Sequence, residues 1–121
     1  PDINVITTYL DSNNEKDEEG NPIIVNQIPD YKILMLHTPD TFDKIKNYNF
    51  DLVLAGHSHN GQIRFPFVGA IITPAGAKKY YDPYYRIDKT DMYISGGLGT
   101  SNINFRFFNR PSFNFYRLAT K

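Results

Sequence analysis

Two short apolar runs, each followed by a histidine, constrain the fold of this chain most. Residues 33–36 (Ile-Leu-Met-Leu) lead directly into His37, and residues 51–55 (Asp-Leu-Val-Leu-Ala) lead into a Gly-His-Ser-His turn at residues 56–59. Short continuous apolar runs are typical of strands that are buried on both faces. We therefore expect two such strands, each with a histidine-bearing turn at its carboxyl end.

The segment between the two runs has the pattern of a short helix. Asp40 or Thr41 is suited to cap a helix that continues to about Tyr48, with Phe42, Ile45 and Tyr48 on one stripe. A strand, helix, strand unit usually pairs its strands in parallel with a right-handed crossover. The sequence thus predicts the α/β class, with both histidine turns at the sheet edge where open α/β sheets place ligands.

The rest of the chain is predicted to be rich in strands, with turns and loops between them. The polar, acidic stretch 11–22 is expected to be a solvated loop, because its spacing is not that of a calcium loop. Neither an internal repeat nor a linker is found, so residues 1–121 form a single domain or part of one. The further expected strands are 3–10, 63–67, 68–73, 92–95 and an alternating strand at 113–118; residues 78–91 and 96–101 are expected to be a tyrosine-rich excursion and a flexible glycine loop.

Composition excludes several classes of protein. The chain has no cysteine, so disulfides and thiolate metal sites are impossible, and any metal must be held by nitrogen and oxygen. No apolar run approaches the roughly 18 to 20 residues that span a bilayer, and the start does not resemble a signal peptide. We therefore expect a soluble chain with an ordinary globular core.

Charge is divided unevenly along the chain. Residues 1–60 carry 4 Lys and Arg against 10 Asp and Glu, whereas residues 61–121 carry 9 against 3, giving net charges of −6 and +6. A basic half can attract an anionic substrate. Attraction between the halves, or differently solvated faces, explains the pattern equally well. Nucleic acid is not an expected partner, because the whole chain is neutral and contains no recognised module.

The three histidines are the strongest candidates for metal ligands. In an extended turn, residues i and i+2 can point to the same side, so His57 and His59 can aim their ring nitrogens into one cleft. The small residues Gly56 and Ser58 allow the backbone to approach such a site. His37 taken alone would more often be a structural histidine. Its place at the neighbouring strand end favours a shared site.

Several segments around these histidines carry a family resemblance. The stretch Gly-His-Ser-His-Asn-Gly-Gln that closes residues 51–62 resembles the terminal Gly-His-x-His motif of calcineurin-like metallophosphoesterases, and residues 33–40 resemble the single-histidine motif that precedes it. Four segments in the same order make the match specific, although Gly-His-x-His alone is weak. Segments similar to a bacterial branch often tethered to membranes lie at 71–76, 95–101 and 106–111, so the resemblance extends over residues 32–118.

The resemblance implies a fold and a reaction. It implies the carboxy-terminal half of a four-layer αββα sandwich, strand-rich with few helices, and hydrolysis of phosphomonoesters or phosphodiesters by a metal-activated water. The cofactors would be two divalent ions of manganese, iron or zinc. His37 and His57 match ligands of one metal, and His59 matches a ligand of the other. The family's amino-terminal motifs, which supply the bridging carboxylate, the asparagine ligand and the catalytic histidine, are absent from the printed sequence.

We therefore expect a fragment with no catalytic residue of its own, inactive alone. The complete protein is expected to be a bacterial phosphohydrolase, cytoplasmic or associated with a membrane through upstream residues. Sheet edges and apolar faces left by the missing half would favour self-association. The alternative is a non-catalytic binding domain on the same scaffold.

Other side chains are weaker candidates. Asn60 and Gln62 are candidates for hydrogen bonding to a phosphate or to a metal ligand, although turn geometry explains them equally well. Arg64 and Arg106 are candidates for steering phosphate, but solvated or ion-paired arginines are more common. The tyrosine cluster at residues 80–86 fits base stacking, a lipid interface or packing under a loop. The loop 96–101 is expected to border the cleft.

Overall fold

The computed structural model describes residues 18–19, 31–101 and 103–119. The strand expected at residues 3–10 and all but two residues of the acidic loop at 11–22 lie outside this described part. Within it, the elements are short strands and 3₁₀ helices, and no helix is long and apolar enough to cross a bilayer. The strand-rich character expected from the sequence is confirmed.

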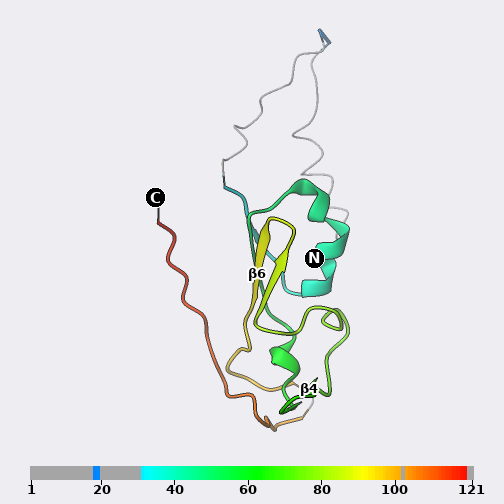
Figure 1. Ribbon diagram of the computed structural model, residues 1–121, viewed down its shortest axis with the longest axis vertical. Coiled ribbons are helices and arrows are strands. Elements are labelled where there is room, and N and C mark those ends of the chain that lie inside the picture. The colour runs from blue at the N-terminus through cyan, green and yellow to red at the C-terminus, as the bar shows by residue number, and fades with distance from the viewer. Residues whose placement is uncertain (1–17, 20–30, 102, 120–121) are drawn as a thin grey trace.

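A mixed, mostly parallel sheet forms the centre of the described part (Figure 1). Its strand order is β1-β2-β6-β5, with β1–β2 and β2–β6 parallel and β5–β6 antiparallel. The expected parallel pairing of the two apolar runs is therefore confirmed, and the architecture is that of a partial α/β fold. The strands are β1 (Ile33–Met35), β2 (Leu52–Ala55), β5 (Tyr84–Ile87) and β6 (Thr90–Ile94).

The connection between β1 and β2 is helical, but it is 3₁₀ rather than α. It consists of η1 (Pro39–Lys44) and η2 (Lys46–Tyr48). Phe42 and Ile45 are fully buried, and their spacing of three matches the three residues per turn of a 3₁₀ helix. The expected cap is wrong, because Thr38 occupies the N-cap position and its side chain makes no capping hydrogen bond.

Asp40 instead joins this connection to a distant loop. Its carboxylate accepts backbone N–H hydrogen bonds from Lys78 at 2.8 Å, Lys79 at 3.1 Å and Tyr80 at 3.0 Å. Its own backbone N–H donates to the carbonyl of Gly76 at 3.0 Å. The loop that follows residue 75 is therefore fastened to the start of η1.

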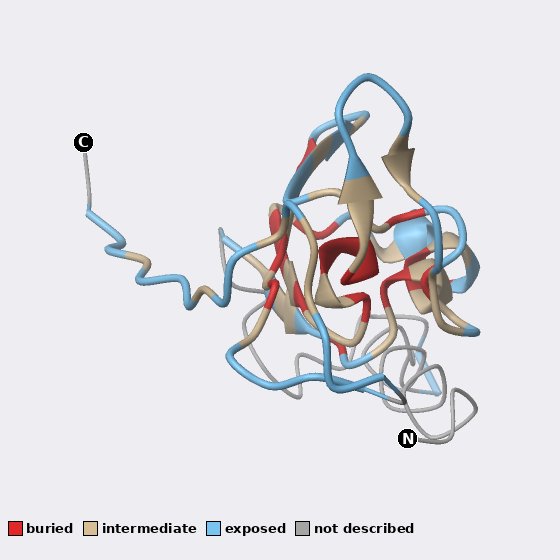
Figure 2. Ribbon diagram, turned by 90° about the horizontal axis from the view of Figure 1, so that it is seen from below, coloured by how far each residue is buried: buried red, intermediate tan, exposed pale blue. Residues whose placement is uncertain are grey.

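One face of the sheet forms the hydrophobic core. Val53 and Met92 have no exposed surface, and Ile94 has almost none, because η1, η2 and the loop around Tyr80 cover them. Figure 2 shows these buried segments gathered at the centre of the molecule. The alternation of β6, buried at every second residue, follows from the period of two along a strand.

The opposite face of the sheet is only partly covered. Leu52 on β2 is buried, but Ile33 and Met35 on β1 are 42% and 80% exposed. The expectation that residues 33–36 are buried on both faces is therefore wrong. The reason is that β1 is an edge strand, and the described residues place no helix or strand over this side of it.

Two hairpins lie beyond β2. β3 (Arg64–Phe65) and β4 (Gly69–Ala70) pair antiparallel where strands and tight turns were predicted, in a shorter form. The hairpin of β5 and β6 begins inside the segment that was predicted to be a polar excursion. Its turn places Asp88 at a positive φ of 51°, a conformation that aspartate tolerates better than most residues.

The strand predicted at residues 113–118 is wrong. These residues are described but form no strand, and Phe115 is 87% exposed (Figure 1). The Tyr116 ring contacts the Tyr93 ring, with centroids 5.4 Å apart. Alternation of aromatic residues favours a strand only when another strand pairs with the backbone, and no described strand does so here.

Candidate metal centre

The turns that follow β1 and β2 lie side by side at one edge of the sheet. The rings of His37 and His57 are 4.7 Å apart between centroids and are tilted by 56°. Backbone hydrogen bonds hold the turns together: Leu36 N–H donates to the Leu54 carbonyl at 2.9 Å, and Gly56 N–H donates to the His37 carbonyl at 3.4 Å. Parallel pairing of two short strands thus brings two imidazoles into contact.

A backbone carbonyl fixes the orientation of His57. Its Nε2 atom lies 2.9 Å from the carbonyl oxygen of Ala75. A carbonyl only accepts, so Nε2 carries the hydrogen in this contact, and in the neutral ring Nδ1 then has a free lone pair. Metal-binding histidines are commonly oriented in this way, by a hydrogen bond from the other ring nitrogen to a carbonyl or carboxylate. Nδ1 of His57 is therefore prepared to donate to a cation.

The backbone of the histidine turn is compact and left-handed rather than extended. His57 and His59 have φ values of 63° and 46°, and Asn60 follows with 50°. The Ser58 side chain stabilises the turn, because its oxygen accepts the Asn60 N–H at 3.0 Å at the start of η3 (His59–Gly61). The expected extended turn is wrong. Such conformations cost of order 1–3 kcal/mol each and gather at functional sites.

His59 lies against the glycine loop and the guanidinium of Arg106. Arg106 Nη2 is 3.2 Å from His59 Nδ1, which accepts in this contact because a guanidinium only donates. Burial lowers the pKa of His59, and the positive charges of Arg106 and His57 lower it further. The ring is therefore neutral near pH 7, which is the form that binds metals. A cation bound by His59 would replace either the Arg106 contact or the Nε2 proton.

The described residues supply part of a metal donor set. They contain two imidazoles in contact and a third in the same turn, but no group of three His, Cys, Asp or Glu side chains close enough to hold a metal ion. A catalytic zinc site commonly uses three protein ligands, and two neighbouring dications need negative charge between them. The three imidazoles are nitrogen donors of the kind that such a centre uses, and its other ligands would have to come from further residues.

Gln62 fastens the loop at residues 101–105 to the histidine turn. Its side-chain nitrogen donates to the carbonyls of Ile103 and Phe105, the latter at 2.7 Å, and its side-chain oxygen accepts the Ser101 N–H at 2.9 Å. Asn60 beside it is buried, and its side-chain oxygen makes no hydrogen bond to any residue that the structure describes. A role for either residue in binding substrate stays a prediction.

The two arginines also hold the site together. Arg64 donates to the Asn60 carbonyl at 3.0 Å and pairs with Asp82 at 2.6 Å. Arg106 donates to the carbonyls of Gly96 at 2.7 Å and Gly97 at 3.1 Å, while its Nη1 is buried without a partner. Contact with phosphate therefore stays a prediction for both.

Sequence reasoning did not identify the structural roles of Asp40 and of the Ala75 carbonyl. Both residues lie in segments that carry the family resemblance, Asp40 in residues 33–40 and Ala75 in residues 71–76, but that resemblance does not indicate that Asp40 anchors a loop or that Ala75 orients His57. The only signal was the Thr-Pro-Asp turn after His37, which was interpreted as a helix start. In the structure, the Asp40 carboxylate of this turn binds the backbone of the loop at residues 78–80 and so holds that loop in place.

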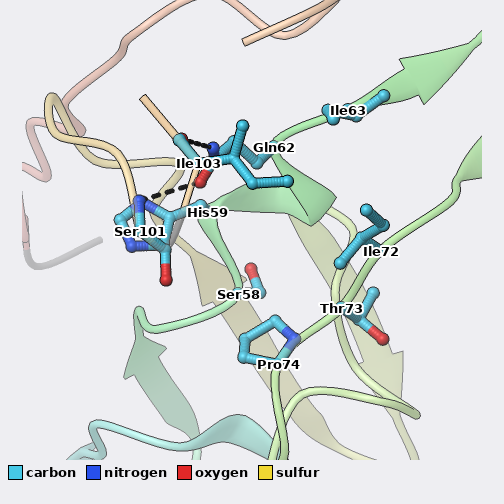
Figure 3. A pocket seen from close by; sticks show the side chains of 9 residues that line it. All are labelled: Ser58, His59, Gln62, Ile63, Ile72, Thr73, Pro74, Ser101 and Ile103. Atoms are coloured by element: carbon cyan, nitrogen blue, oxygen red, sulfur yellow. Dashed lines mark hydrogen bonds between the residues drawn. The ribbon is translucent and has the colours of Figure 1, made fainter. Parts of the chain in front are cut away.

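A cavity of about 220 Å³ lies beside His59 (Figure 3). It lies between the histidine turn, Ser101, Ile103 and the segment that follows β4. Its lining residues are Ser58, His59, Gln62, Ile63, Ile72, Thr73, Pro74, Ser101 and Ile103.

Comparison with known proteins shows which class of protein the chain is similar to. The similarities establish homology to bacterial metallophosphoesterases, members of the calcineurin-like superfamily. The chain is 39% identical over 90 residues to the uncharacterized metallophosphoesterase YkuE of Bacillus subtilis (strain 168), covering 74% of this chain and 32% of that protein. No family profile matches the chain, and neither does any solved structure.

Two further relatives carry names that describe an activity. Phosphodiesterase YaeI of Escherichia coli (strain K12) is 30% identical over 69 residues, covering 57% of this chain and 26% of that protein. UDP-2,3-diacylglucosamine pyrophosphatase LpxG of Chlamydia muridarum (strain MoPn / Nigg) is 30% identical over 89 residues, covering 65% and 26%. The chain thus spans about a third or less of the length of these relatives.

Proposed function

We propose that the protein containing this chain is a binuclear metal-dependent phosphoesterase that hydrolyses phosphomonoesters or phosphodiesters. The observation that carries the proposal is the contact between His37 and His57 at the ends of adjacent parallel strands, with His57 oriented by Ala75. The relatives named phosphodiesterase and pyrophosphatase support the same reaction class. In this proposal the chain is the carboxy-terminal part of a four-layer αββα sandwich.

The residues of this chain would act by binding and orientation. His37 and His57 would hold one divalent ion and His59 the other, with manganese, iron or zinc as the candidates. Bound metals would supply Lewis acidity and an activated water. The Ala75 carbonyl keeps His57 in the tautomer that leaves Nδ1 free, and the lowered pKa keeps His59 neutral. None of these residues is proposed to transfer a proton.

The test uses the complete product of the reading frame that encodes this chain. Its metal content and its hydrolysis of a chromogenic phosphodiester are measured with Mn²⁺ and with a chelator. His57→Ala and His59→Ala are expected to lower kcat/KM at least about 100-fold and to reduce the bound metal, because ligands to catalytic metals are lost. Lys89→Ala is the control, because Lys89 is exposed in the turn between β5 and β6, at the opposite end of the parallel strands from the histidines. Full activity and metal content in both histidine variants would overturn the proposal.

A non-catalytic binding domain is the second candidate. The incomplete set of metal-binding side chains favours it, since the described residues contain three imidazoles but no close group of three metal-binding side chains. The same experiment separates the two. Binding of phosphate esters without hydrolysis at any metal concentration, by the complete protein, would favour the binding domain.

A further inference from the structure

We propose that the cavity beside His59 binds the apolar group of an amphiphilic phosphate ester whose phosphate lies at the histidines. This inference rests on the proposed phosphoesterase function and narrows its substrate class. The occupant is an alkyl or aryl group attached to phosphate, rather than a sugar or another strongly polar group. The cavity and its lining are shown in Figure 3.

The walls of the cavity are predominantly apolar. Ile63 and Ile72 flank the β3–β4 hairpin, and Pro74 and Ile103 contribute from two further segments. His59 and Ser101 lie on one side of the cavity, and Ile72 and Thr73 lie on the other (Figure 3). An apolar group placed between them would be removed from water on several sides. Burial of apolar surface is the favourable contribution that such walls can make.

Hydrogen bonds between distant segments hold these walls in place. Ile71 N–H donates to the Ile63 carbonyl at 3.0 Å, which fixes the base of the hairpin. Gln62 fastens the loop that contains Ile103, and Phe107 N–H donates to the Gln62 carbonyl at 3.1 Å. The cavity is therefore a formed feature of the fold, with little ordering left to occur when a ligand enters.

The polar atoms in the lining are mostly engaged with the protein. Ser58 Oγ donates to the Tyr81 carbonyl at 3.4 Å and accepts the Asn60 N–H at 3.0 Å. The side-chain nitrogen of Gln62 donates to two carbonyls, and its oxygen accepts a backbone N–H. A hydroxylated group in the cavity would lose hydrogen bonds to water and recover few. An apolar group has no such cost.

Charge favours phosphate at the His59 end. The Arg106 guanidinium lies 3.2 Å from His59, so its positive charge stands beside the proposed phosphate position. No Asp or Glu occurs in residues 61–81 or 92–121, so the segments that line the cavity carry no opposing negative charge. An ester held there by its phosphate would direct its organic group into the cavity.

The test measures how affinity changes with the length of the apolar group. Binding of methyl, butyl and hexyl phosphate to the isotopically labelled chain is followed by NMR titration, below the concentrations at which these compounds associate. Affinity should rise about fourfold per methylene, the ratio for full burial of a CH₂ group, until the cavity is filled. Ile72→Asn and Ile103→Asn should flatten this dependence and leave methyl phosphate binding unchanged.

Ile71→Asn is the matched control. Ile71 and Ile72 are adjacent and about equally exposed, at 54% and 51%, but only Ile72 lines the cavity. Equal affinity for methyl and hexyl phosphate in the unaltered chain would overturn the inference. So would equal losses in Ile71→Asn and Ile72→Asn, because the alkyl group would then adsorb to exposed surface. Circular dichroism melts confirm that each variant is folded.

The titrations are repeated on the complete product of the reading frame, because this chain supplies only part of the metal donor set. They are done with Mn²⁺ and with a chelator to separate this inference from the proposed function. A dependence on alkyl length that persists in both conditions supports the cavity, whatever the metal does. Loss of metal binding with a retained length dependence would count against the phosphoesterase proposal alone. A flat length dependence with retained metal binding would count against the cavity alone.

Discussion

The two faces of the central sheet have similar apolar sequences but different surroundings. On the closed face, Val53, Met92 and Ile94 are buried beneath η1, η2 and the loop around Tyr80. On the open face, Met35 is largely exposed, and the Tyr93 ring contacts the rings of Tyr84 and Tyr116. The same strands carry both faces, so strand composition alone does not decide burial.

The difference shows which part of the described chain forms its own core. The connection between β1 and β2 returns over the closed face and supplies Phe42 and Ile45, so that face is complete within about sixty residues. The open face has apolar residues but no cover among the described elements. Because the matched residues span only 32% of the Bacillus subtilis relative, we propose that the open face is covered in the complete protein.

Truncating a methionine on each face gives the largest predicted difference in the free energy of unfolding. The chain has two methionines, Met92 on the closed face and Met35 on the open face. Met92→Ala should lower the free energy of unfolding by about 2–5 kcal/mol, because it leaves a cavity in a packed core. Met35→Ala should change it by less than about 0.5 kcal/mol. Urea unfolding followed by circular dichroism measures both, and equal effects would refute the assignment of the faces.

Removing a side-chain hydroxyl from each face gives the next largest predicted difference in the free energy of unfolding. Thr90 on the closed face is buried, and its hydroxyl donates to the Phe50 carbonyl at 2.6 Å. Thr90→Val should cost about 1–3 kcal/mol, since the carbonyl is left buried without its donor. Tyr93→Phe, its counterpart on the open face, should cost less than about 0.5 kcal/mol. A Thr90→Val variant as stable as the parent would show that water reaches Phe50.

The sequence predicted the parts of the fold that depend on neighbouring residues. The two apolar runs, their parallel pairing and the burial of Phe42 and Ile45 followed from local pattern. It did not predict which face of β1 stays open, because burial depends on which other segments pack there. The prediction of a strand at residues 113–118 was wrong for a similar reason, since a strand needs a partner strand and no described strand pairs with these residues.

For the candidate site, the sequence predicted the location better than the geometry. Parallel strands place His37 and His57 at one edge of the sheet. This placement could be predicted from the two apolar runs, each followed by a histidine. The left-handed backbone of His57 and His59 was not, because histidine has no strong preference for it and tertiary hydrogen bonds impose it. The hydrogen bond between His57 and the Ala75 carbonyl could not be predicted either, since any residue supplies a carbonyl.

Mild oxidation of the two methionines gives the smallest predicted effect on stability and the most direct measure of exposure. Dilute hydrogen peroxide should convert Met35 to the sulfoxide well before Met92, because the reagent reaches exposed thioethers first. The sulfoxide at Met35 should leave the unfolding midpoint unchanged, since its polar oxygen faces water. Peptide mass spectrometry gives the two rates, with the urea-unfolded chain as the control in which both react alike. If the rates are also equal in the folded chain, the closed face opens as readily as the open one, and the contrast between the faces fails.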